Sequence, residues 1–227
     1  QVDRRDFLKS SVAAAVGTAI ATGSSPSPAA QTGSAGMPMG KIKNLTISRL
    51  ISGGNLISGW AHARDLSYVH HLMANYNTEQ KVLETLALLE ECGVNAIIAD
   101  PRKKPMDIFK AHWKRGGKIQ WIAEGHPEPN DLKTNIKASI DWGASAVYIQ
   151  GVIGDRWLKE GHTDKLGECV DFIKSQGVPG GLGAHMLDVI VNAEARGFDA
   201  DFYVKTLHHS NYWSSRRPDQ GVDVVSN

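Results

Sequence analysis

The feature that most constrains the fold is a recurring glycine, which stands at the end of each of five successive segments of helical character. Gly93, Gly116, Gly143, Gly177 and Gly197 each follow a stretch in which apolar residues recur at helical spacing, and they lie 23, 27, 34 and 20 residues apart. Glycine adopts the left-handed conformation that ends many helices without a steric penalty. A chain with helix ends placed in this way is built from repeated units that each contain a helix.

Each of these glycines is followed by a short run of residues that favours a β-strand. One more run precedes the first helix, so we expect six strands, at 45–52, 96–99, 119–123, 146–149, 180–184 and 202–207. Strands that alternate with helices form a parallel sheet through crossover connections. Side chains suited to capping a helix stand before three of the helices, at Asn77, Asp131 and Thr163.

The sequence of the turn after the first strand distinguishes between two possible folds with a parallel sheet. It reads Ser-Gly-Gly-Asn at 52–55 and lacks the glycine spacing of a dinucleotide-binding turn. We therefore expect an α/β fold of the (β/α)8 TIM-barrel type in preference to a doubly wound sheet. A complete barrel takes about 250 residues, so residues 37–227 would hold about six of the eight units. We expect the C-terminal units to be missing from this chain.

Composition limits the classes of function. The 227 residues include 25 Lys and Arg against 24 Asp and Glu, and such a balance argues against nucleic acid as a partner. A hydrophobic content of 41% with 22% charged residues is typical of a globular domain. The two cysteines, Cys92 and Cys169, are too few for a disulfide framework, and we expect both to be small buried hydrophobic side chains.

Residues 1–36 have the layout of an export signal. A charged start is followed by an apolar run at 12–21 and by a segment rich in Gly, Ser, Pro and Ala. The pair Arg4-Arg5, with Phe-Leu-Lys at 7–9, resembles a twin-arginine signal. This resemblance implies that the twin-arginine export machinery carries the protein to the bacterial periplasm or cell exterior. The apolar run is too short for a stable membrane span.

Two segments resemble the aldo/keto reductases. Residues 47–55 are similar to the opening barrel strand of that family, and Glu-Glu-Cys-Gly-Val-Asn at 90–95 is similar to a run that follows its first helix. The catalytic residues of the family do not carry over: no tyrosine follows Asp100 where the family places one, and the strand at 119–123 ends without the family's lysine. We therefore expect a related barrel with different chemistry, and NADP is not expected as a cofactor.

Polar side chains end the expected strands, at the end of a β/α barrel where active sites are built. Asp100 would orient the substrate or a histidine, Glu124 would act as a base or a metal ligand, and His126 would act as a ligand or a proton shuttle. His185 and His208 would be metal ligands. Imidazoles mixed with carboxylates suit divalent Zn, Mn or Fe, although a structural hydrogen bond remains the alternative role for each histidine.

Lys205 offers a second chemistry. It lies within the expected strand at 202–207, and a buried lysine with a lowered pKa can form a Schiff base with a carbonyl substrate. A lysine paired with a carboxylate of the barrel is the alternative. Contacts with a small-molecule substrate are expected from the long loop at 55–77 and from two later strand ends, specifically from Asn55, Trp60, Arg64, Gln150 and His209.

Together these residues predict an exported barrel enzyme. It would carry out metal-assisted or acid–base chemistry on a sugar, a polyol or a related carbonyl compound, as an isomerase, a lyase or a hydrolase. Two alternatives remain open at this point. One is an NADP-dependent oxidoreductase similar to the aldo/keto reductases, and the other is a non-catalytic periplasmic carbohydrate-binding barrel.

Overall fold

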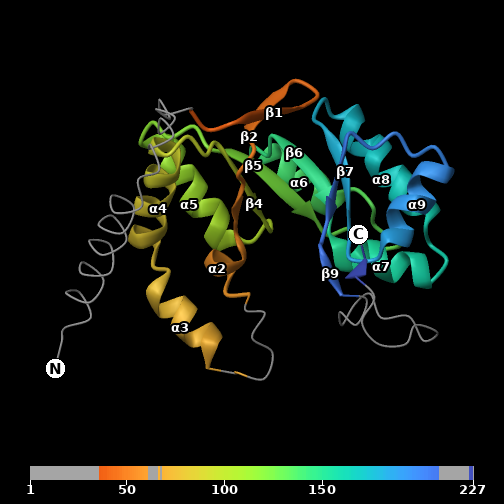
Figure 1. The fold of residues 1–227 in the computed structure, drawn as a ribbon, viewed down its shortest axis with the longest axis horizontal. Coiled ribbons are helices and arrows are strands. Elements are labelled where there is room, and N and C mark those ends of the chain that lie inside the picture. The colour runs from red at the N-terminus through yellow and green to blue at the C-terminus, as the bar shows by residue number, and fades with distance from the viewer. Residues whose placement is uncertain (1–35, 61–65, 67, 210–224, 227) are drawn as a thin grey trace, which may run out of the picture. The chain divides into compact units, whose positions relative to one another are not determined.

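The computed structural model describes residues 36–60, 66, 68–209 and 225–226. Within them, six parallel strands form one sheet in which each strand lies beside the next one in the chain. The sheet is curled into a half-barrel with helices on its outer side (Figure 1). Its strands are β3 (Ser52–Gly53), β4 (Ala96–Ala99), β5 (Gln120–Gly125), β6 (Ala146–Ile149), β7 (Gly180–Ala184) and β8 (Phe202–Lys205). This consecutive order confirms the barrel-type fold, because a doubly wound sheet reverses its strand order.

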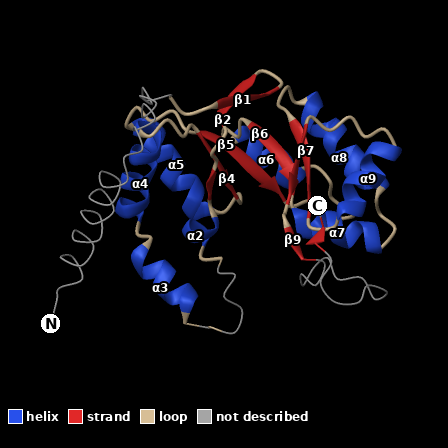
Figure 2. Ribbon diagram, viewed as in Figure 1, coloured by secondary structure: helices blue, strands red, loops and turns tan. Residues whose placement is uncertain are grey.

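The helices end where the glycines predict. Gly93, Gly116, Gly143, Gly177 and Gly197 all have positive φ angles, between 72° and 108°. No helix in the described part of the chain is long and apolar enough to cross a membrane. The helices, shown in blue in Figure 2, are α2 (Asn55–Ser58), α3 (Val69–Tyr76), α4 (Glu79–Glu91), α5 (Lys103–Lys114), α6 (Thr134–Asp141), α7 (Gly151–Lys159), α8 (Asp164–Ser175) and α9 (Leu187–Ala195).

The first expected strand is not continuous. Its first half, β2 (Leu45–Ser48), pairs with β1 (Met39–Ile42) in an antiparallel hairpin, and only β3 joins the parallel sheet. The chain turns between them at Ser48, whose hydroxyl donates a hydrogen bond to the Leu50 carbonyl at 2.6 Å. The prediction of one strand over 45–52 is therefore wrong, because the side chain of Ser48 favours a local bend. A second antiparallel pair joins β9 (His208–His209) to β10 (Val225–Ser226).

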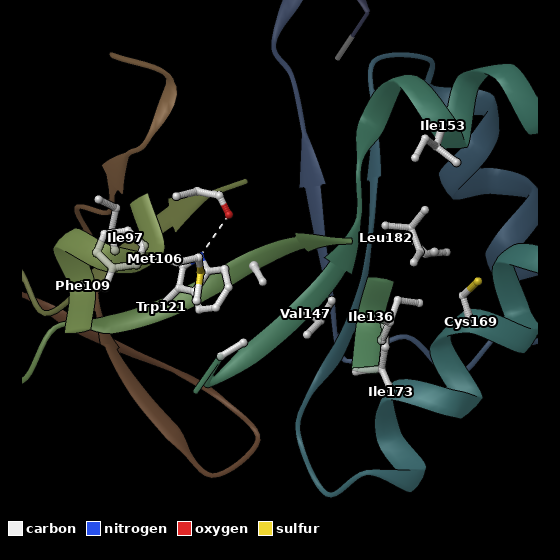
Figure 3. Close-up of a cluster of buried hydrophobic side chains, with 14 of the residues drawn as sticks. Ile97, Met106, Phe109, Trp121, Ile136, Val147, Ile153, Cys169, Ile173 and Leu182 are labelled. Atoms are coloured by element: carbon white, nitrogen blue, oxygen red, sulfur yellow. Dashed lines mark hydrogen bonds between the residues drawn. The ribbon is translucent and has the colours of Figure 1, made fainter. Parts of the chain in front are cut away.

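The strands separate two hydrophobic layers. Residues that point outward pack against the helices, among them Ile97, Trp121 and Leu182, which are almost fully buried (Figure 3). The Trp121 indole also donates a hydrogen bond to the Ala99 carbonyl, at 3.0 Å. Alternate residues point to the concave face, where the aliphatic floor continues up to the ring of Tyr148. The concave face is therefore apolar at its base and becomes polar only near the carboxyl ends of the strands.

The two cysteines occupy different environments. Cys169 is buried on α8, and burial raises the pKa of its thiol to about 12. Cys92 is exposed because it stands at the C-terminal cap of α4, where the helix ends at the surface. The expectation of a buried thiol is therefore confirmed for Cys169 and wrong for Cys92.

Candidate functional site

A carboxylate and a phenol lie side by side on the concave face. Glu124 on β5 lies directly opposite Tyr148 on β6, and the buried phenol interacts with the Glu124 carboxylate. Burial is the main cause that raises the pKa of Tyr148 well above its usual value, and the negative charges of Glu124 and Asp100 add to it. The phenol therefore stays protonated at neutral pH and holds the carboxylate in place.

A histidine completes this group. His126 follows β5, and its Nε2 lies 3.6 Å from Oε2 of Glu124. Its backbone N–H donates to Oδ1 of Asn135 on α6, at 2.7 Å. Nε2 is buried and makes no hydrogen bond with the residues described. The structure thus brings two of the predicted residues together, because the imidazole of His126 lies beside the carboxylate of Glu124.

Asp100 directly follows the neighbouring strand β4, and three side chains contact its carboxylate. One carboxylate oxygen accepts a hydrogen bond from the Ser58 hydroxyl, and the other accepts one from the Trp60 indole at 3.0 Å. The latter oxygen also lies 3.0 Å from Nε of Arg102. Asp100 is buried, so these partners compensate the cost of burying its charge. It fixes α2 and the following indole on the carboxyl end of the sheet.

A second acid–base pair stands two strands away from Glu124. His185 follows β7, and its Nδ1 lies 2.7 Å from Oδ2 of Asp155 on α7. The other oxygen of Asp155 accepts the backbone N–H groups of His185 and Met186, at 3.0 and 2.9 Å. Asp155 is buried. A carboxylate on Nδ1 orients the ring and makes Nε2 the basic nitrogen.

Lys205 does not share the concave face with Glu124. It pairs in register with Ala184, which belongs to the layer under the helices, as does its strand neighbour Tyr203. Burial lowers the pKa of Lys205, and the negative charge of Asp155 opposes this effect. Its ammonium donates to the Thr206 carbonyl at 2.6 Å. Strand alternation turns the side chain of Lys205 to the outer layer, and the Schiff-base chemistry expected of it stays a prediction.

The predicted metal ligands whose side chains are described, Glu124, His126 and His185, do not gather around one point. Among the described side chains, no three His, Cys, Asp or Glu residues lie close enough together to hold a metal ion. Glu124 and His126 form one pair, while the ring of His185 is engaged by Asp155 from α7. His208 belongs to β9, and the placement of its side chain is not described.

The residues predicted to contact the substrate lie at different places in the fold. Gln150 caps α7, since its side-chain oxygen accepts the Val152 N–H at 3.1 Å. Trp60 lies at the Asp100 cluster, and Asn55 begins α2 nearby. His209 forms part of β9, with its side chain undescribed, and Arg64 lies outside the described residues.

The sequence analysis did not single out four side chains of these clusters as site residues: Ser58, Arg102, Tyr148 and Asp155. Tyr148 could have been found by strand alternation, because it stands two positions before Gln150 on a predicted strand. Asp155 had a weaker signal, a carboxylate two positions from each of the apolar residues Ile153 and Trp157. Its partner lies 30 positions further along the chain, and no local pattern indicates that pairing.

The raised pKa of Tyr148 makes stability depend on pH in the alkaline range. The unfolded chain releases phenolic protons near pH 10, whereas the folded chain retains the proton on Tyr148. The unfolded state therefore binds fewer protons above pH 10, and the free energy of unfolding falls as the pH rises. We expect Tyr148→Phe to make this fall shallower in urea unfolding at pH 9–11. An identical slope in the variant would contradict the raised pKa.

The fold and the site define the chain as a parallel β/α half-barrel with acid–base side chains at the carboxyl ends of its strands. No protein-family model and no curated protein matches the sequence. Among solved structures, the chain is similar to a variant of pyruvate carboxylase from Rhizobium etli, described with the allosteric activator acetyl coenzyme A. The identity is 14% and the TM-score 0.40, over 56% of this chain and 14% of that one.

Proposed function

We propose that the protein is an exported enzyme that transfers protons on a small oxygenated compound. The observation that carries the proposal is the contact of 2.7 Å between His185 Nδ1 and the buried Asp155 carboxylate. A buried acid that fixes one nitrogen of an imidazole prepares the other nitrogen for general acid–base catalysis. Export rests on the Arg4-Arg5 signal in the sequence.

His185 would act as the general base, through Nε2. Because Asp155 accepts from Nδ1, a proton taken up at Nε2 places the positive charge of the ring beside a carboxylate. Such a base suits removal of a proton from a carbon next to a carbonyl, or from a hydroxyl group. The substrate would be a sugar, a polyol or a related carbonyl compound, and the enzyme an isomerase or a lyase.

Glu124 would bind or deprotonate a hydroxyl group of the same substrate. Its carboxylate is held by Tyr148 and lies beside Nε2 of His126. Tyr148 is buried beside the carboxylate, on the next strand, so it would be a positioning residue. The 3.6 Å between the carboxylate and the buried Nε2 leaves no room for a substrate atom, so His126 would act on the substrate through Glu124.

The similarity of residues 47–55 and 90–95 to the aldo/keto reductases supports a common ancestry of the barrels, with different chemistry in this chain. The reductase tyrosine is absent after Asp100. The acid–base pairs of this chain are Glu124–His126, at the end of β5, and Asp155–His185, between α7 and the end of β7. These differences favour proton transfer over nicotinamide-dependent reduction.

Proton exchange with solvent tests the proposal directly. The purified protein is incubated in D2O with a panel of sugars, polyols and keto acids, and loss of C–H signals is followed by proton NMR. We expect exchange on at least one compound, and His185→Gln should lower its rate about 100-fold or more. His112→Gln is the matched control, because His112 is also buried and lies 3.1 Å from a carboxylate, that of Glu90.

Two results would contradict the proposal. One is absence of exchange across the panel, which together with binding of a sugar would favour the carbohydrate-binding barrel. The other is an equal loss of exchange in the His185 and His112 variants, because the second histidine lies between α4 and α5, outside the concave face.

A further inference from the structure

The cluster around Asp100 leaves a guanidinium group oriented beside the site. Nε of Arg102 lies 3.0 Å from the buried carboxylate of Asp100. The centre of the guanidinium lies 4.1 Å from the centroid of the Trp60 ring. Arg102 is therefore fixed at its inner edge by a charge and on one face by an indole, which together restrict the rotation of a long side chain.

The outer edge of this guanidinium is available. The contact of 3.0 Å with Asp100 is made by Nε, and within the described residues the two terminal nitrogens of Arg102 donate no hydrogen bond. The side chain remains 53% exposed. Two parallel N–H groups in one plane match the two oxygens of a carboxylate.

The position of Arg102 connects it to the proposed site. It follows β4 by three residues, at the same end of the sheet as Glu124 and His126. Asp100, its anchor, is close enough to Tyr148 for its charge to raise the pKa of that phenol. The guanidinium and the acid–base residues therefore border one end of the half-barrel.

We propose that Arg102, held by Asp100 and Trp60, binds the carboxylate of the substrate. This inference rests on the proposed function and narrows its substrate class to small hydroxy acids or keto acids. The negative charge of Asp100 partly offsets the positive charge of Arg102, and this weakens the positive field of the guanidinium. A singly charged, planar carboxylate is therefore favoured over a doubly charged phosphate, which needs a stronger positive field.

Calorimetric titration with pyruvate, glycolate and inorganic phosphate tests the inference. We expect the protein to bind pyruvate or glycolate more tightly than phosphate, and Arg102→Gln to weaken this binding about 10-fold or more. Arg102→Lys retains the charge beside Asp100 and should show an intermediate loss, because an ammonium lacks the planar pair of donors. Arg196→Gln is the matched control, since Arg196 is 44% exposed and paired with Asp164.

The outcomes separate this inference from the proposed function. Equal binding by the wild-type protein and Arg102→Gln would overturn the inference, as would tighter binding of phosphate or no binding of the carboxylates. Carboxylate binding that is lost in Arg102→Gln, without proton exchange on any compound, would retain the inference and contradict the proposed function. Proton exchange on neutral sugars at a rate that Arg102→Gln leaves unchanged would support the proposed function and contradict the inference about Arg102.

Discussion

Asp155→Ala is expected to lower the free energy of unfolding by about 3 kcal/mol. The buried carboxylate accepts the backbone N–H groups of His185 and Met186 as well as Nδ1 of the His185 ring. Alanine leaves these donors buried without an acceptor, and each unsatisfied donor costs about 1–3 kcal/mol. Urea unfolding followed by circular dichroism measures the loss.

Asp155→Asn separates stability from catalysis. The amide oxygen can still accept both backbone N–H groups, so we expect a loss of only about 1 kcal/mol. The amide cannot stabilise a positive charge on His185, so kcat for proton exchange should fall about 1000-fold, with a smaller change in KM and a shifted pH profile. Asp141→Asn, an exposed carboxylate paired with Lys137, should change neither quantity. Equal stability of Asp155→Ala and Asp141→Asn, or an unchanged kcat in Asp155→Asn, would contradict these roles.

The repeating part of the fold was predictable because its signals are local. A glycine in the left-handed region and a following run of β-forming residues are both set within a few positions of the chain. Three strands, 96–99, 146–149 and 180–184, have the bounds that the sequence predicts. Asp131, an expected cap, accepts the N–H groups of Lys133 and Thr134, although the N-cap position of α6 itself is Lys133.

The β1–β2 hairpin was missed for the opposite reason. The β-forming run that begins at Leu45 suits an antiparallel strand and a parallel one equally well, and only the bend after Ser48 distinguishes them. That bend is stabilised in part by Asn95, whose side chain accepts the Ser48 N–H from 47 positions away. Contacts over such a distance leave no periodic pattern in the sequence.

The candidate site was predictable as far as strand ends determine it. Glu124 and His126 were found together because two residues of one strand end must lie close. His185 was found for the same reason, but its predicted role as a metal ligand depended on the direction of its ring. That direction is set by Asp155, which is carried by a helix packed on the outside of the sheet. Strand position gives the place of a side chain, and tertiary packing decides its partner.

The helix that carries Asp155 lies unusually close to the sheet. A Cβ atom at Gly154 would stand 2.5 Å from the Gly183 carbonyl oxygen of β7, and one at Gly183 would stand 2.8 Å from the backbone nitrogen of Gly151, which begins α7. Backbone atoms form both contacts, so no side-chain rotation can relieve them. Glycine at these two positions permits α7 to approach β7 closely enough for Asp155 to reach His185.

Gly154→Ala should therefore damage stability and the site together. We expect a loss of about 3 kcal/mol in the free energy of unfolding, because overpacking against backbone forces α7 away from the sheet. The same movement should weaken the downfield NMR signal of the His185 Nδ1 proton that Asp155 binds. Gly53→Ala is the matched control, since a Cβ at that strand position meets no atom within 4 Å, and it should change stability by less than about 0.5 kcal/mol. Comparable stability of the two variants, or a fully retained Nδ1 signal in Gly154→Ala, would show that the close approach of α7 does not position the acid–base pair.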